Sequence, residues 1–333
     1  MKRKILSWFI MVMAVPPAFG EEEFRVAWPV ACELGKDCFI QNYVDRDPSK
    51  MMVDYTCSRM TYDGHKGTDI RIANLARMRE GVKVLAAAEG VVRGVRDGVE
   101  DVYFGDADKK TVQNRECGNG VVLRHPGGIE TQYCHLRKGS IAVKQGEEVK
   151  TGQVLGLIGL SGFTEFPHVH FEVRRGKTII DPFVGETKQT GCHVERHPIW
   201  TRDALETISH IPTAVLASGF AVEKVTAPEA RDGKYNEKTF RPDAPLIMFW
   251  VDVMGILPGD RIELEIKFPD GKSLVDHHQN YDKGKAQIFH FLGKKREEEA
   301  WPKGTYTASF TLKRKKGGEY QISIFHTDKM EVK

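Results

Sequence analysis

Apolar and polar residues alternate at every second position through several segments of this 333-residue chain. Clear examples are the apolar sets Ile262, Leu264, Ile266, Phe268 and Tyr306, Ala308, Phe310, Leu312, each interleaved with charged or hydroxyl side chains. Because successive side chains of a strand point to opposite faces, this period predicts half-buried β-strands. Only residues 72–79 and 201–209 carry a weak helical pattern. The alternation therefore predicts an all-β protein.

The predicted strands fall into two groups. In the first, strands are expected at 82–92, 120–124, 131–136, 154–158 and 168–173, with a polar, acidic insertion at 95–117. The second group begins near residue 211, and its short strands at regular spacing favour a small antiparallel sandwich. There the stretch from Trp301 to Tyr306 resembles the start of a strand in immunoglobulin-like domains. We expect a first domain at 21–190, a linker at 191–210 and an immunoglobulin-like β-sandwich at 211–333.

The first twenty residues have the pattern of a secretion signal. Lys2, Arg3 and Lys4 precede an apolar run at 5–15, and small residues follow at 18 and 20. The apolar run is shorter than a stretch that spans a bilayer. We therefore expect residues 1–20 to be a signal peptide. The mature chain is predicted to be exported, periplasmic or secreted, with no stable membrane span once the signal is removed.

The charge balance argues against a nucleic-acid partner. The chain has 49 Lys and Arg residues against 46 Asp and Glu residues, a formal net charge of +3. Three of the cations lie in the predicted signal peptide, which has no acid, so the mature chain is electroneutral. No basic field remains to attract nucleic acid. The shares of hydrophobic residues (41%) and charged residues (29%) are typical of a globular protein with a sizeable core.

Six cysteines, all before residue 193, agree with export. They are Cys32, Cys38, Cys57, Cys117, Cys134 and Cys192. An even number in an exported chain indicates disulfides, and six cysteines allow 15 connectivities. Cys134 lies in a predicted strand, where a buried thiol is the alternative. We expect a local Cys32–Cys38 bridge together with Cys57–Cys117 and Cys134–Cys192.

Histidines and acids gather in two short segments that suit a metal site. His65 and Asp69 lie four residues apart in a glycine-rich segment. His168 and His170 project from one face of a predicted strand, and Glu172 comes next on that face. Imidazoles and a carboxylate suit zinc, and three protein ligands with an open fourth position are typical of a catalytic site. No H-E-x-x-H helix is present, which excludes the common zincin arrangement.

A further histidine comes from another predicted strand. His135 follows Thr131 and Tyr133 at alternate positions, and we expect all three to point outward as His168 and His170 do. Cys134 and His135 are not expected to form a nucleophilic pair, because adjacent strand residues point to opposite faces.

The ordered motifs resemble those of the lysostaphin/LytM-type zinc metallopeptidases. The matching segments are Gly64–Asp69, Tyr133–Leu136 and His168–Glu172, together with a scaffold of glycines at 90, 118, 120, 127, 128, 146, 152, 156 and 159. The resemblance covers residues 60–185. It implies a LytM-type antiparallel β domain with a groove that holds one zinc ion per chain. Members of the family typically cut peptide bonds in the stem peptides or cross-bridges of bacterial peptidoglycan.

The resemblance also implies roles for five residues. The zinc ligands would be His65, Asp69 and His170, and the catalytic residues would be His135 and His168. The chain departs from the family in having bulky residues at 163–167, just before the histidine pair, and a longer connection at 95–117. Both departures border the expected groove, so they bear on substrate preference more than on zinc binding.

These observations predict an exported zinc metalloendopeptidase that acts on peptidoglycan peptides. Two alternatives remain open. One is a non-catalytic envelope protein that regulates a cell-wall hydrolase, and the five intact residues count against it. The other is a metallopeptidase with a protein substrate.

Overall fold

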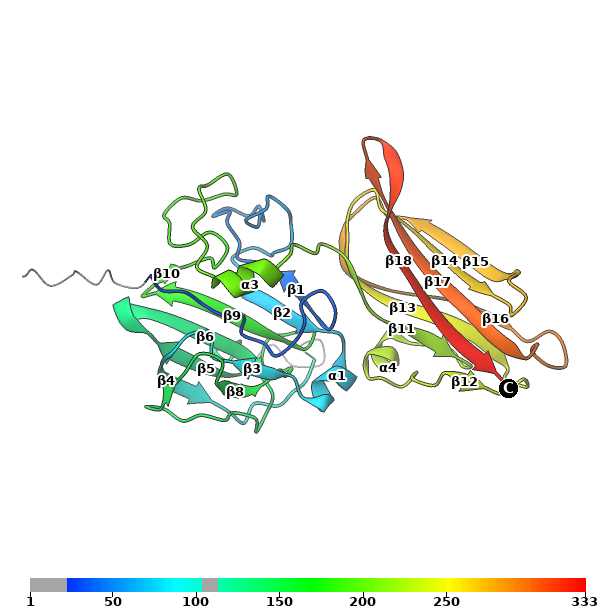
Figure 1. The fold of residues 1–333 in the computed structure, drawn as a ribbon, viewed down its shortest axis with the longest axis horizontal. Helices are drawn as coiled ribbons and strands as arrows, with labels where there is room; N and C mark the ends of the chain where they lie inside the picture. The colour runs from blue at the N-terminus through cyan, green and yellow to red at the C-terminus, as the bar shows by residue number, and fades with distance from the viewer. Residues whose placement is uncertain (1–22, 104–112) are drawn as a thin grey trace, which may run out of the picture.

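The computed structural model describes residues 23–103 and 113–333, and strands predominate in it (Figure 1). The strands up to residue 179 are β1 Cys38–Asn42, β2 Thr68–Ile72, β3 Lys83–Leu85, β4 Gly90–Arg96, β5 Asn119–Arg124, β6 Ile129–Leu136, β7 Glu148–Val149, β8 Val154–Leu157, β9 His168–Arg175 and β10 Thr178–Ile179. The later strands are β11 Ala214–Ala221, β12 Thr239–Phe240, β13 Leu246–Ile256, β14 Arg261–Lys267, β15 Ser273–Asn280, β16 Lys285–Lys295, β17 Gly304–Lys316 and β18 Glu319–Val332. The helices are α1 Leu75–Glu80, the 3₁₀ turn η2 Pro126–Gly128, α3 Arg202–Thr207 and α4 Ala227–Arg231. The all-β prediction is confirmed. The predicted signal peptide and residues 104–112 of the predicted insertion lie outside the described residues.

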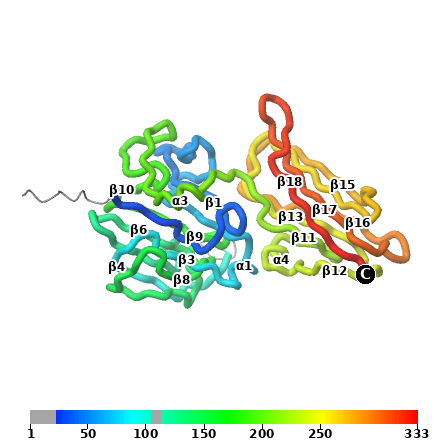
Figure 2. Tube along the Cα trace, in the orientation of Figure 1, coloured from blue at the N-terminus to red at the C-terminus, as the bar shows by residue number. Residues whose placement is uncertain are grey.

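An eight-stranded sheet organises the N-terminal part of the chain. Its strands follow the order β1-β2-β9-β6-β5-β4-β7, with β10 paired to β9, and every pairing is antiparallel. The small sheet β3-β8 and the segment 23–34 cover one face of it (Figure 2). Val26 bridges to Trp200 and Val30 bridges to Val84, which fixes this segment over the core. The opposite face carries Asp69 on β2 and the histidines His168 and His170 on β9.

The segment predicted as a linker, 191–210, packs against the N-terminal core. Ile199, Trp200 and Ala204 are buried in the same hydrophobic cluster as the eight-stranded sheet. The weak helical pattern at 201–209 forms α3, whose N-cap is Thr201. This segment is therefore part of the N-terminal unit's core as well as a connection.

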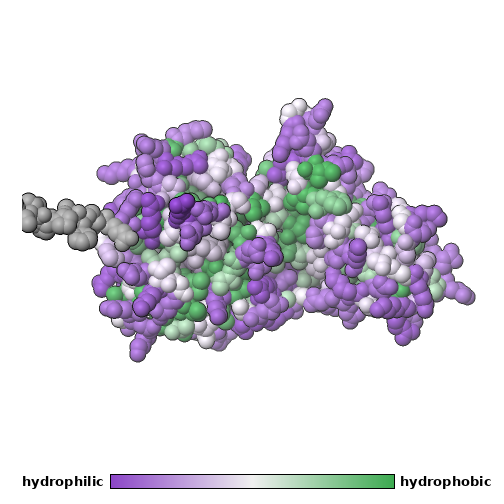
Figure 3. Space-filling view, in the orientation of Figure 1, coloured by the Kyte–Doolittle hydropathy of each residue, from purple (hydrophilic) through white to green (hydrophobic). Residues whose placement is uncertain are grey.

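The C-terminal part consists of two sheets around one core. The sheet β11-β13-β16 and the sheet β12-β18-β17-β14-β15 share a cluster that includes Phe249, Val251, Ile262, Leu264 and Phe310. This arrangement agrees with a two-layer sandwich, while its immunoglobulin-like character stays a prediction. In Figure 3 hydrophilic residues cover most of the visible face, and hydrophobic residues gather near the middle, where the two parts adjoin.

The structure corrects two of the three predicted disulfides. Cys32–Cys38 is present as expected, but the others are Cys57–Cys192 and Cys117–Cys134. Cys117 lies two residues before β5, and Cys134 lies on the adjacent strand β6, so their Cα atoms are 4.8 Å apart. Cys57 and Cys192 lie 135 residues apart in the sequence, in two loops that the fold brings together. The predicted pairs Cys57–Cys117 and Cys134–Cys192 are wrong because sequence order does not reveal which strands and loops become neighbours.

Candidate functional site

Three of the predicted site residues converge beside the β2–β9 pair. Asp69 on β2 and His170 on β9 are directly paired across the two strands, so their side chains share a face. His65 lies in the loop that leads into β2. His65 Nε2, Asp69 Oδ1 and His170 Nδ1 lie 2.8–3.1 Å from one another. The structure therefore brings together the three residues that the family resemblance assigns to zinc.

Surrounding groups fix which atoms point into this cluster. His65 Nδ1 is 2.7 Å from the Tyr43 carbonyl oxygen. Because a carbonyl only accepts, His65 donates its Nδ1–H there and turns the lone pair of Nε2 toward Asp69. Asn42 Nδ2 donates to Asp69 Oδ2 at 2.8 Å, which leaves Oδ1 for the cluster. On the far side of His170, Nε2 lies 3.9 Å from Glu172 Oε2. The cluster therefore presents two nitrogens and one carboxylate oxygen in fixed orientations.

The donor set fits a zinc ion. Tetrahedral ligands at 2.0–2.1 Å from zinc lie about 3.3 Å from one another, close to the separations found here. His65 and Asp69 are 3% and 2% exposed. The lone pair of buried His65 Nε2 faces the carboxylate oxygen of Asp69. The two groups repel each other unless a cation or a proton lies between them. The arrangement thus calls for positive charge at the point where the three atoms converge.

The electrostatics of the cluster agree with this reading. Burial alone would raise the pKa of Asp69, but the charges of His65 and His168 and hydrogen bonds from His168 and His170 hold that pKa well below its ordinary value. Burial alone would lower the pKa of His170, but its interactions with Asp69 and Glu172 raise that pKa to about 9. Without a metal ion the site therefore retains a proton, and a cation can take its place.

The two remaining predicted residues lie beside the cluster. The ring centroids of His135 and His168 are 4.6 Å apart, and His168 Nε2 is 3.5 Å from Asp69 Oδ1. His135 Nδ1 is 2.8 Å from the Ser161 carbonyl oxygen, and His168 Nδ1 is 2.9 Å from that of Phe166. Both imidazoles therefore donate their Nδ1–H to the backbone, and in the neutral form of each ring Nε2 is left as an acceptor.

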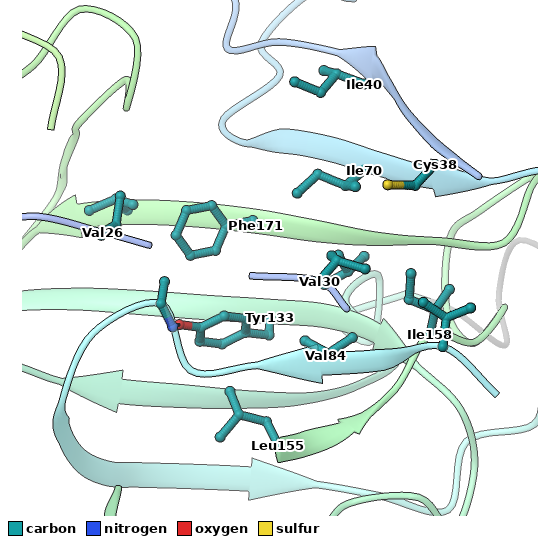
Figure 4. Close-up of a cluster of buried hydrophobic side chains, with 14 of the residues drawn as sticks. Val26, Val30, Cys38, Ile40, Ile70, Val84, Tyr133, Leu155, Ile158 and Phe171 are labelled. Atoms are coloured by element: carbon teal, nitrogen blue, oxygen red, sulfur yellow. Dashed lines mark hydrogen bonds between the residues drawn. The ribbon is translucent and has the colours of Figure 1, made fainter. Parts of the chain in front are cut away.

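The geometry of His135 differs from the prediction. Thr131 and Tyr133 do not point outward with it, because both are fully buried on the core face, where Tyr133 pairs with Phe171 of β9 (Figure 4). By alternation His135 would also face the core. Instead it has a positive φ of 61°, and the β5–β6 register shifts nearby. Such a conformation is uncommon outside glycine and is concentrated at functional sites. This local backbone turn brings His135 to the side of His168.

Burial and charge keep His135 neutral. Burial lowers its pKa well below the ordinary value for histidine, and positive charge on His168 and His170 lowers the pKa further. A neutral imidazole whose Nδ1–H is held by a carbonyl can accept a proton only at Nε2. The arrangement is suited to proton transfer beside the cluster.

The structure adds supporting residues that the sequence did not single out. Thr164 Oγ1 lies 3.0 Å from His168 Nδ1, beside the Phe166 carbonyl. Glu172 is held by Arg174, whose Nη1 donates to its Oε1 at 2.7 Å. Asn42 comes from β1, whose sequence offers no motif. Only its register opposite Asp69, visible after folding, identifies it.

Two other groups of potential ligand atoms occur in residues 23–103 and 113–333. One comprises Cys57, Cys192 and His193, and the other comprises Cys32, Asp37 and Cys38. Each contains a disulfide pair, so its sulfurs are not available to a metal. In the same part of the chain no helix is long and apolar enough to cross a membrane.

Comparisons with known proteins point to the same region. Residues 63–182 match the model of Peptidase family M23. The chain is 35% identical over 119 residues to the cell division protein DipM of Caulobacter vibrioides. The aligned region covers 35% of this chain and 17% of DipM. It is 34% identical over 108 residues to the peptidoglycan DD-endopeptidase ShyC of Vibrio cholerae. Here the aligned region covers 32% of this chain and 19% of ShyC.

Among solved structures, the chain is similar to the catalytic domain of the antimicrobial peptidase lysostaphin from Staphylococcus simulans. The sequence identity is 22% and the TM-score is 0.28, with 42% of this chain and 85% of that chain covered. The matched part of this chain spans between 14% and 28% of the length of the first curated relatives.

Proposed function

Residues 63–182 form a domain of peptidase family M23, and on this premise we propose that the chain is an exported zinc metalloendopeptidase of peptidoglycan. The predicted family resemblance is confirmed over that range. The proposed reaction is hydrolysis of peptide bonds in stem peptides or cross-links. The observation that carries the proposal is the convergence of His65, Asp69 and His170 next to His135 and His168.

His65, Asp69 and His170 would hold one zinc ion per chain. Zinc bound by three protein ligands acts as a Lewis acid that polarises a carbonyl and activates water. The protein prepares the ligands for this role. Tyr43 and Asn42 orient two of them, and Glu172 faces the outer nitrogen of His170. Such supporting contacts fix the ligand tautomer and tune its basicity.

His135 and His168 would move the proton. In its neutral form each presents an unprotonated Nε2, because its Nδ1–H is donated to a backbone carbonyl. Nε2 of one histidine takes the proton from the attacking water and later delivers it to the nitrogen of the departing amine. Once protonated, the same Nε2–H can donate to the oxyanion that develops on the scissile carbonyl. No carboxylate is needed as the general base.

Three features support a peptidoglycan substrate and an exported protein. ShyC and ShyA of Vibrio cholerae, which are similar to this chain, carry the name peptidoglycan DD-endopeptidase. Among the described residues every cysteine is in a disulfide, which suits an oxidising compartment. The signal-peptide pattern at 1–20 agrees with secretion.

A digest of purified peptidoglycan tests the proposal. The full mature chain, loaded with zinc, is incubated with the polymer, and the products are identified by mass spectrometry. We expect wild-type protein to release fragments in which one peptide bond has been hydrolysed, and His168→Ala to release them at a rate about 10²- to 10⁴-fold lower. If the zinc-loaded chain cleaves no peptide bond in the polymer, the proposal fails, and the non-catalytic regulator becomes the better explanation.

A further inference from the structure

The C-terminal sheets contact the end of the site-bearing sheet through a polar network. Ala214, Leu216 and Met254, on β11 and β13, are buried in the N-terminal core cluster. Beside them Gln41 Nε2 donates to the Ala286 carbonyl of β16 at 3.3 Å. This contact lies one residue from Asn42, which holds Asp69.

A buried arginine stands at the centre of this contact. Arg71 lies on β2 two residues after Asp69, is paired in register with His168, and is 2% exposed. Its Nη1 donates to Gln41 Oε1 at 2.6 Å and to Gln287 Oε1 of β16 at 3.1 Å. Its Nε has no hydrogen-bond partner in the described part of the chain. Arg71 therefore joins the site-bearing strand to the C-terminal sheet.

In the C-terminal part, hydrogen bonds fix the side chain of Gln287. Gln287 Nε2 donates to both carboxylate oxygens of Asp252 on β13, each at 2.7 Å. Arg231 of α4 makes a two-point ion pair with the same carboxylate, at 2.7 and 3.1 Å. The amide of Gln287 cannot rotate without losing these bonds, so its Oε1 stays directed at Arg71.

On its other side Arg71 contacts Phe166, whose backbone carbonyl accepts a hydrogen bond from His168. Its guanidinium lies over the Phe166 ring, 4.7 Å from the centroid. The Phe166 ring is in turn 4.5 Å from the His168 ring, and its carbonyl accepts the Nδ1–H of His168. Contacts thus run without a gap from Asp252 through Gln287, Arg71 and Phe166 to His168.

A role limited to holding the N-terminal and C-terminal sheets together does not explain why a buried arginine lies at this contact. Burying a cation without a directly contacting carboxylate is costly, and apolar side chains would join two sheets at lower cost. Arg71 is also on the same face of β2 as Asp69, beside His168 on β9.

We propose that Arg71 and Gln287 are positioning residues for His168, so that the C-terminal sheets complete the active site. The proposal rests on the function proposed above. The C-terminal part then acts in the reaction itself, by fixing the orientation of a proton-transferring imidazole, in addition to any role in targeting. Misplacement of such a group by about 1 Å can cost on the order of 10²-fold in rate.

Substitution of Gln287 in the full chain tests the proposal. Gln287→Met keeps the size of the side chain, at a half-buried position, but removes the one of the two acceptors of Arg71 that belongs to the C-terminal part. We expect unchanged zinc content, a kcat about 10- to 100-fold lower and a KM within about threefold. Arg71→Lys keeps the charge but loses the planar guanidinium group. We expect the same result for it, a lower kcat with little change in KM or zinc content. Gln279→Met, at an exposed position of β15, is the matched control and should behave as the wild type.

The protonation state of the His168 imidazole, measured by NMR, tests this proposal independently of the proposed peptidase activity. In wild-type protein, ¹⁵N spectra of the imidazole of His168 should show a single tautomer protonated at Nδ1. In Gln287→Met they should show a mixture or a shifted signal, whether or not the protein hydrolyses peptidoglycan. Wild-type kcat together with an unchanged His168 signal in Gln287→Met and Arg71→Lys would overturn the proposal. So would an equal loss of kcat in Gln279→Met.

Discussion

Replacing Asp181 with asparagine should remove a pH-dependent part of the protein's stability. Asp181 follows β10 and is 1% exposed. Its Oδ1 accepts the N–H of Phe183 at 2.9 Å, while Oδ2 has no hydrogen-bond partner among the described residues. Burial raises the pKa of this carboxyl from an ordinary 3.8 to about 6. The folded protein thus carries an incompletely satisfied carboxylate above pH 6.

The sign and size of the effect follow from the raised pKa. Well below its ordinary pKa of 3.8 the carboxyl is protonated in both the folded and the unfolded chain, and the burial cost is small. Between pH 4 and pH 6 the folded state keeps a proton that the unfolded chain has released, so the free energy of unfolding falls until the buried carboxyl ionises in the folded state as well. A difference of two pKa units corresponds to about 3 kcal/mol, lost between pH 4 and pH 7.

The assay is urea denaturation of wild type and Asp181→Asn at intervals from pH 4 to pH 8. The neutral amide keeps an acceptor for Phe183, so the difference in unfolding free energy between the two proteins should change by about 2–3 kcal/mol across this range, in favour of the variant at high pH. The same substitution at exposed Asp282 is the matched control. A pH-independent difference for Asp181→Asn would refute the reasoning.

Three further predictions concern the supports of the fold and the site. Replacing Cys57 and Cys192 together with alanine opens a loop of 135 residues and should lower the free energy of unfolding by about 5 kcal/mol in urea denaturation. Glu172→Gln should weaken zinc binding by about 10- to 100-fold in a competition titration with a chelator, because it removes the charge that faces His170. Gly118→Ala would place a Cβ 2.3 Å from the carbonyl oxygen that holds the site histidine of β6, and should reduce kcat on the order of 10²-fold at full zinc content.

Local sequence patterns were sufficient for much of the site. The H-x-H pair fixes two side chains on one strand face by period alone, and the structure places His168 and His170 there. The spacing of His65 and Asp69 likewise agrees with a loop that leads into a strand. Such relations depend on neighbouring residues, which the sequence displays directly.

Relations between distant segments could not be read in the same way. The orientation of His135 depends on a positive φ and a shift in strand register, which break the alternation used to predict it. β13 lacks the alternating pattern because both of its faces are buried, Phe249 in the C-terminal core and Met254 in the N-terminal core. The disulfide partners of Cys57 and Cys117 were mispredicted for the same reason. Each depends on which strands or loops become neighbours, and no short-range rule determines that.

Zinc content and hydrolysis rate, measured together on two alanine variants, test the central claim most directly. His170 is assigned to the metal and His168 to the proton, although they lie two residues apart on one face of β9. We expect folded His170→Ala to lose both zinc and activity. Folded His168→Ala should keep about one zinc ion per chain while its rate falls by about 10²- to 10⁴-fold. A zinc-loaded His170→Ala together with a zinc-free His168→Ala would contradict the account.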